Sequence, residues 1–206
     1  MKSFTCALTL LAAVLAVLVL PATAQAVEIS FFRGKTADVE FYSTDPTGCM
    51  VTSVVVTAME NRYFSPPAPL ETNASADVNI GLYNICTSEL TFCGDGSFDL
   101  PDGAFKLTGL LASATLNLTG VIHDGCFGTN RPFTLALTWT GEGEVFRGRS
   151  HSSTHSPGHH VSYRQSGQSR DATVAGRITL DGTPLPLDTH SGALSKASNG
   201  TITRSP

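Results

Sequence analysis

Alternation of apolar and polar residues at a period of two is the feature that most constrains this chain. It recurs in residues 78–82, 112–122, 133–140 and 172–181. Successive side chains of a strand point to opposite faces, so each segment predicts a strand with one buried and one solvated face. Such strands favour an antiparallel sheet, and no helical crossover of the kind that parallel sheets need is evident between them. We expect the following residues to be buried: Val78, Ile80, Leu82, Leu116, Leu118, Leu135, Leu137, Trp139, Val174 and Ile178.

Turn signals between these segments indicate how many strands the chain forms. Pro66-Pro67, Pro157-Gly158 and Asp181-Gly182 are typical turn dipeptides. The spacing predicts an all-β fold of about eight to ten short strands, arranged as an antiparallel β-sandwich or, alternatively, as a closed up-and-down β-barrel. The predicted domain spans residues 27–187. Residues 188–206 are rich in Ser, Gly and Ala and are expected to form a flexible tail with at most one short strand.

The N-terminus has the residue order of a secretory signal. Met1-Lys2 gives a positive start, residues 6–20 are apolar, and Ala24-Gln25-Ala26 forms a small-residue cleavage site. The apolar run of about 15 residues is shorter than the ~20 that span a bilayer. We therefore predict that residues 1–26 are a cleaved signal peptide. The mature chain should then have no transmembrane helix and should be secreted or periplasmic.

Four cysteines remain after such cleavage: Cys49, Cys86, Cys93 and Cys126. An even number in an oxidising compartment predicts two disulfides, for which three connectivities are possible. Cys86 and Cys93 are poorly placed to bond each other, because Ser88-Glu89-Leu90 between them is poor turn chemistry. The simplest prediction pairs Cys49 with Cys86 and Cys93 with Cys126, although the spacing alone does not settle the connectivity.

The sequence contains no strong catalytic motif, such as Gly-x-Ser-x-Gly, His-Glu-x-x-His or a Gly-rich phosphate loop. Catalytic groups can be assembled from distant residues, so this does not exclude an enzyme. The sequence favours a non-enzymatic exported module that binds a ligand or an envelope component and needs no cofactor. A secreted hydrolase with a spatially assembled site and a purely structural or adhesive envelope protein are the alternatives.

An acidic segment offers a candidate calcium site. Asp95, Ser97 and Asp99 would place oxygen ligands at the first, third and fifth positions of a loop, as a calcium loop begins. Leu100 and Lys106 stand where an EF-hand needs Gly and Glu. An acidic connection between strands is therefore the alternative interpretation.

The segment from 146 to 177 is the most distinctive, because it is cationic in a chain of net charge −4. It contains the arginines Arg147, Arg149, Arg164, Arg170 and Arg177, the histidines His151, His155, His159 and His160, and one acid, Asp171. Such a segment attracts anions. An acidic polysaccharide or lipid headgroups would fit better than nucleic acid, because the arginines are not interleaved with aromatic residues. The candidate ligand-binding residues are Arg147, Arg149, His155, His160 and Arg164, and a solvated polar hairpin is the alternative.

The same segment offers a candidate metal site. A tight turn at Pro157-Gly158 would place His155 opposite His160, with Cβ atoms ~5 Å apart. Two imidazoles at that separation can share a transition metal, but His151 would lie ~13 Å from His155 along the strand and could not be the third ligand. Protonation of these histidines would make the hairpin more cationic below about pH 6.5.

Overall fold

The computed structural model describes residues 26–205, and every regular element in that range is a strand. The strands are β1 (Ala26–Thr44), β2 (Met50–Phe64), β3 (Glu71–Asn84), β4 (Glu89–Asp99), β5 (Phe105–Thr108), β6 (Ser113–Asp124), β7 (Thr129–Gly141), β8 (Phe146–Ser156), β9 (His159–Leu180), β10 (Thr183–Pro184) and β11 (Thr189–Ser205). The predicted signal peptide lies outside the described residues, apart from Ala26. Between residues 26 and 205 there is no helix that could cross a membrane.

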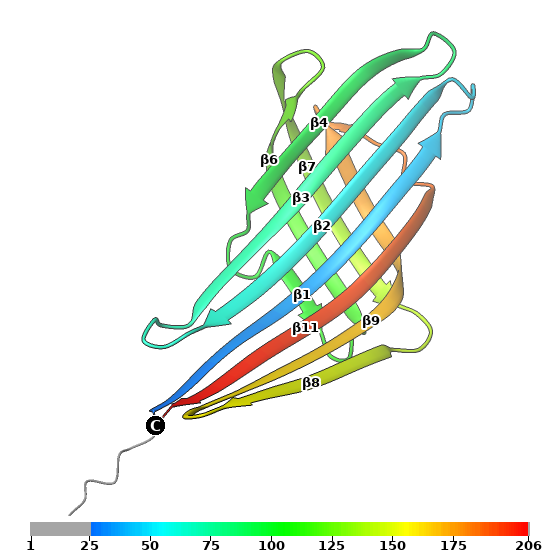
Figure 1. Ribbon diagram of the computed structural model, residues 1–206. Helices are drawn as coiled ribbons and strands as arrows, with labels where there is room; N and C mark the ends of the chain where they lie inside the picture. The colour runs from blue at the N-terminus through cyan, green and yellow to red at the C-terminus, as the bar shows by residue number, and fades with distance from the viewer. Residues whose placement is uncertain (1–25, 206) are drawn as a thin grey trace, which may run out of the picture.

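All the strands belong to one antiparallel sheet, which confirms the predicted fold class. Pairing runs from β9 through β11, β1, β2, β3 and β4 to β6. β6 then pairs with β7, and β7 pairs with β9 again. The sheet therefore curls on itself into a barrel-like body (Figure 1). β4 and β6 meet over only two residue pairs, Gly94 with Asp124 and Asp95 with His123. We call this contact the seam.

The core fills the body and includes the alternating residues that the sequence singles out. Trp139, Phe41, Phe92 and Phe133 are its largest fully buried side chains. Nine of the ten residues predicted to be buried are buried, and the tenth, Leu82, is partly buried against the core. The indole N–H of Trp139 donates to the carbonyl of Asp38, at 2.8 Å. The one polar group of the largest core side chain is therefore satisfied.

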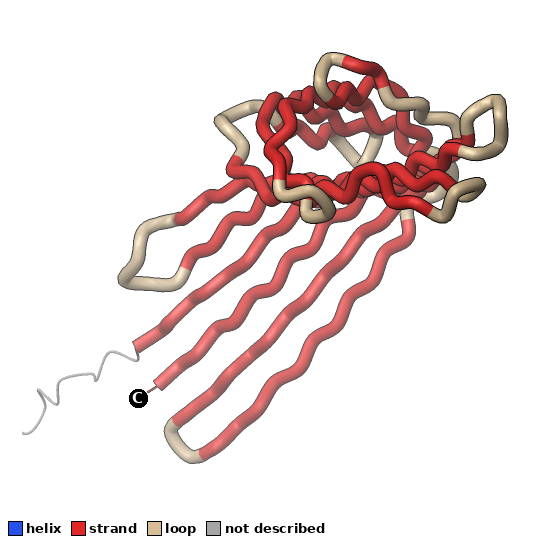
Figure 2. The backbone as a smooth tube through the Cα atoms, turned by 90° about the horizontal axis from the view of Figure 1, so that it is seen from above, coloured by secondary structure: helices blue, strands red, loops and turns tan. Residues whose placement is uncertain are grey.

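Beyond the body, several strands continue side by side as an open layer, which Figure 2 shows projecting away from the curled part. We call this layer the extension. It consists of residues 26–36 of β1, 59–64 of β2, 71–75 of β3, 146–156 of β8, 159–170 of β9 and 195–205 of β11. Nearly all of its side chains are exposed or half-buried. Backbone pairing, rather than a core, therefore organises the extension.

Two predictions about the strands are wrong. The structure has eleven strands instead of eight to ten, and several are long: β9 has 22 residues and β1 has 19. Residues 188–206 are not a flexible tail, because β11 pairs with β1 along one edge and with β9 along the other. The predicted boundary of the β domain at residue 187 is therefore too early. Most of β11 is exposed or half-buried on both faces and lacks the alternation that marks a half-buried strand, so the sequence pattern did not indicate its length.

The two disulfides have the predicted connectivity. Cys49 bonds Cys86 and Cys93 bonds Cys126, with Cα separations of 5.2 and 5.5 Å. The first joins the chain ahead of β2 to the chain after β3, and the second joins β4 to the chain after β6. Disulfides of this kind are compatible with an oxidising, exported environment.

Candidate anion-binding face

The register of the strands determines which side chains share a face of the extension. In β1, Ala37, Val39 and Phe41 point into the core. Counting back along the strand by two brings Lys35 and Arg33 onto the same side, because alternate residues share a face. The core-facing side of the sheet thus continues into the extension, where no second layer covers it.

Residues opposite each other in a ladder also share a face, which extends this assignment to the other strands. We define the cationic face by the nine basic residues that it collects: Arg33, Lys35, Arg62, Arg147, Arg149, Arg164, Arg170, Lys196 and Arg204. The whole chain has 13 Lys and Arg. Lys2 lies outside the described residues, so this face holds nine of the remaining twelve.

Acidic residues are nearly absent from the cationic face. Glu60 is the one acid that the register places on it, while Glu28 and Glu71 of the extension lie on the opposite face. Lys35 Nζ and Arg62 Nε contact Glu60 Oε1 at 2.9 and 3.0 Å. The charge on this face therefore remains strongly positive.

Two of the nine cations help to hold the rim of the body. The guanidinium of Arg170 donates to the carbonyls of Glu142, Gly143 and Leu111. Lys196 Nζ donates to the carbonyl of Gly109. These carbonyl contacts do not neutralise the charges, but they fix both side chains.

The exposed arginines of the face are free to meet a ligand. Within the described chain, no ion pair joins Arg147, Arg149, Arg164 or Arg204 to an acid, and the Arg33 guanidinium lies 5.4 Å from the centre of the Phe31 ring. Residues of β1, β8, β9 and β11 line a hollow of about 560 Å³ here, among them Phe31, Arg33, Arg149, His151 and Arg164.

Like charges on the face affect one another's protonation. Desolvation, His155 and Arg204 together lower the pKa of His160 below its usual 6.5. Desolvation and the neighbouring Lys35 lower the pKa of Lys196. Glu60 is partly desolvated, which raises its pKa, but hydrogen bonds and attraction from Lys35 and Arg62 outweigh this and lower it overall. Desolvation is the largest cause for each group; the basic neighbours add to it for His160 and Lys196 and outweigh it for Glu60.

The histidine hairpin has the predicted geometry. Gly158 has a φ of 80° in the turn, and His155 lies opposite His160, with ring centroids 4.0 Å apart. His151 is on the same face, opposite Arg164, and its Nε2 lies 3.1 Å from the hydroxyl of Ser162. No group of three metal-ligating side chains in the described range includes this pair. Binding of a metal by His155 and His160 therefore stays a prediction.

The structure brings together all five residues predicted to bind a ligand: Arg147, Arg149, His155, His160 and Arg164. Arg177 and His159 of the same segment lie on the opposite face of β9. The sequence reasoning missed Arg33, Lys35, Arg62, Lys196 and Arg204, which come from distant segments. The spacing of Arg33 and Lys35 by two residues was the available signal, but they stand in the more acidic half of the chain.

The predicted calcium loop is wrong. Asp95, Ser97 and Asp99 lie in β4, opposite Asn79, Asp77 and Ser75 of β3. Side chains two residues apart on a strand are about 7 Å from each other and point in parallel. They form a row on the solvated face, so they cannot wrap around a cation.

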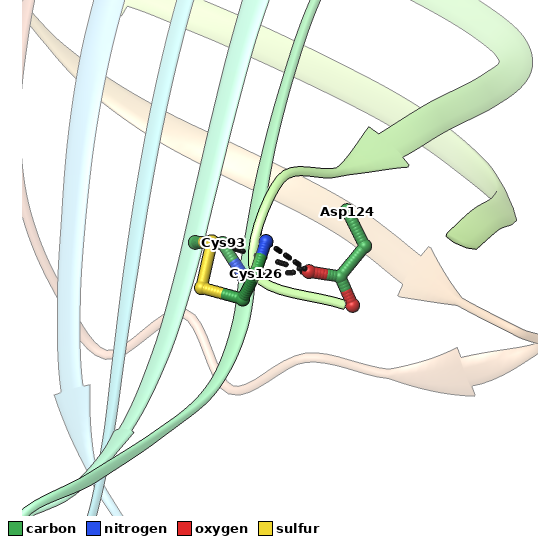
Figure 3. A group of neighbouring side chains, drawn as sticks. All are labelled: Cys93, Asp124 and Cys126. Atoms are coloured by element: carbon green, nitrogen blue, oxygen red, sulfur yellow. Dashed lines mark hydrogen bonds between the residues drawn. A yellow bond between two sulfur atoms is a disulfide. The ribbon is translucent and has the colours of Figure 1, made fainter. Parts of the chain in front are cut away.

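A second cluster lies at the seam, where Cys93, Asp124 and Cys126 meet (Figure 3). Asp124 is fully buried, and its Oδ1 accepts hydrogen bonds from the backbone N–H of Cys126 at 3.1 Å and of Cys93 at 3.4 Å. Its Oδ2 has no hydrogen bond and lies 3.8 Å from Arg131. Both sulfurs are in the disulfide, and a metal would require thiolates. We therefore interpret the cluster as a structural contact, in which the disulfide and the Asp124 hydrogen bonds hold β4 and β6 together at the seam.

Comparison with known proteins gives no family for this chain. No family model and no curated protein matches it. Among solved structures, it is similar to a provisionally assigned AttH protein from Nitrosomonas europaea, at 18% sequence identity and a TM-score of 0.30. The match covers 87% of this chain and 52% of that protein, so this chain spans about half of its length. At this TM-score the likeness carries no argument about fold or function.

Proposed function

We propose that the protein is an exported, non-enzymatic module that binds an anionic polymer or an anionic component of the cell envelope through the cationic face. The observation that carries the proposal is the gathering of nine basic residues, from five strands, on one uncovered face. Most of them contribute nothing to a core, since the extension has none. A surface of one sign attracts ligands of the other and accelerates their association.

Export supports the same interpretation. The predicted signal peptide would direct the chain out of the cytoplasm, and the two disulfides are compatible with an oxidising compartment. Acidic polysaccharides and lipid headgroups are the polyanions that such a protein meets there. Isolated exposed arginines bind each anionic group weakly, so the ligand should be one that presents many charges at once.

The proposal is tested by retention on a heparin column as salt is raised. Arg149→Gln with Arg164→Gln removes two exposed guanidinium groups from the hollow. The affinity should fall roughly 2- to 30-fold, at about 0.2 to 1 kcal/mol for each exposed charge. The salt dependence should become shallower, because fewer counterions are released.

Arg177→Gln is the matched control, because Arg177 is an exposed arginine of β9 on the opposite face. Its retention should equal that of the unaltered protein. Two results would show that the cationic face is not the binding surface. One is retention that does not change with salt concentration, and the other is a loss of retention in Arg177→Gln as large as that in the double variant.

A further inference from the structure

An apolar cluster lies within the cationic face, toward the free end of the extension. It consists of Val27, Ile29, Phe31, Phe64 and Ile202, which the register places side by side on β1, β2 and β11. Ile29 is opposite Ile202, and the rings of Phe31 and Phe64 stack with centroids 5.3 Å apart. Val27 is 53% exposed and Ile29 is 46% exposed. Apolar side chains on this part of the face are thus exposed to solvent rather than packed in a core.

The basic residues border this cluster. Arg204 is opposite Val27. On β1, Arg33 is two residues after Phe31, and on β2, Arg62 is two residues before Phe64. Arg164 lies in the same cross-strand row as Phe31, two strands away. The surface therefore has apolar side chains inside and guanidinium groups around them.

We infer that the partner is the surface of a lipid bilayer rich in anionic phospholipid; this inference rests on the proposed function. A hydrophilic polyanion would pair with the arginines but would leave the apolar cluster in water. A bilayer interface satisfies both, since headgroup phosphates meet the cations while apolar side chains enter the boundary with the acyl chains. Charge complementarity and the position of the apolar residues inside the basic border both fit this partner.

A second copy of the chain fits this face poorly. Two cationic faces packed against each other would oppose nine positive charges to nine, with only Glu60 to neutralise them on each side. The pairing across the extension is also regular, with no register shift in β1, β8, β9 or β11. A regular, open layer can lie along an extended surface without any rearrangement.

The test uses the full mature protein with phosphatidylglycerol-containing and pure phosphatidylcholine vesicles. Cosedimentation should occur with the anionic vesicles alone and should be lost at high salt. Val27→Ser with Ile29→Ser should weaken vesicle binding several-fold without altering retention on heparin. Both side chains are about half exposed, so these changes spare the core. Val121→Ser, a residue of the body that is 56% exposed, is the matched control and should bind vesicles normally.

Ile29→Trp provides a second readout. The chain has a single Trp, and Trp139 is fully buried, so its emission should stay constant. A tryptophan at position 29 should shift to the blue with anionic vesicles and not with heparin. The lipid inference is wrong, and the proposed function stands, if the protein is retained on heparin but does not bind anionic vesicles. The same holds if the protein is retained on heparin and Val27→Ser with Ile29→Ser leaves vesicle binding unchanged. If neither heparin nor vesicles bind, both fail.

Discussion

Asp124 offers a direct test of how the seam between β4 and β6 is held. This carboxylate is fully buried, yet only one of its oxygens makes hydrogen bonds. Oδ1 accepts from the backbone N–H groups of Cys126 and Cys93, while Oδ2 faces Arg131 at 3.8 Å, beyond hydrogen-bonding distance. The acceptor and the charge can therefore be removed separately.

Asp124→Ala removes the acceptor. It leaves the Cys126 N–H, and more weakly the Cys93 N–H, without the carboxylate acceptor that the fully buried Asp124 supplies. An unsatisfied buried donor costs about 1 to 3 kcal/mol, and these donors are partly exposed, so the free energy of unfolding should fall by roughly 1 to 3 kcal/mol. Asp124→Asn keeps the carbonyl oxygen in place, removes the charge that faces Arg131 at 3.8 Å and puts an amide donor where Oδ2 lies, so it should cost less than Asp124→Ala.

Urea unfolding under oxidising conditions, followed by circular dichroism, measures both variants with the disulfides intact. The expected order of stability is unaltered protein, Asp124→Asn and then Asp124→Ala. A loss below about 0.5 kcal/mol in Asp124→Ala would mean that the disulfide alone holds the seam. Equal losses in both variants would mean that the charge facing Arg131 matters more than the backbone hydrogen bonds.

Further predictions concern the core, the pH dependence of stability and metal binding. Leu137→Ala should cost roughly 2 to 5 kcal/mol in urea melts, because Leu137 is buried in the core, and a loss below about 0.5 kcal/mol would contradict this. Hydrogen bonds from Thr47, Met50 and Cys49 lower the pKa of Asp45. Its contribution to stability is therefore full above the unfolded value of 3.8 and is lost as the pH falls through the lower folded value; Asp45→Asn should flatten that part of the stability profile. Calorimetry should show zinc binding weaker than micromolar, because His155 and His160 supply two ligands; micromolar binding abolished by His155→Ala would instead establish a metal site.

The body could be predicted from the sequence because its strands bury one face. In β7, the apolar residues at odd positions from Phe133 to Trp139 are buried and the residues between them are exposed, as the alternation predicts. The disulfides could also be predicted, since the poor turn chemistry between Cys86 and Cys93 disfavoured a bond between them. Both inferences depend on local geometry, which a short stretch of sequence contains.

The extension could not be predicted in the same way. β11 is made mainly of Ser, Gly, Ala, Thr and Asn, residues that are typical of a flexible tail when no partner strand is known. Its place beside β1 depends on pairing with residues more than a hundred positions away in sequence. The cationic face is a product of this pairing, so the sequence grouped the arginines of β8 and β9, which are close in sequence, but not the basic residues of β1, β2 and β11.

The charges on this face should oppose stability while they serve binding. Like charges that are not neutralised repel one another in the folded state, and after desolvation, which is the larger cause, this repulsion also lowers the pKa of His160 and Lys196. Arg149→Gln with Arg164→Gln should therefore leave the melting temperature unchanged or raise it slightly, while affinity for anionic vesicles and heparin falls. The gain in melting temperature should disappear at high salt, where the repulsion is screened. A clear loss of stability in this variant would show instead that the two arginines hold the sheet together and were never free for a ligand.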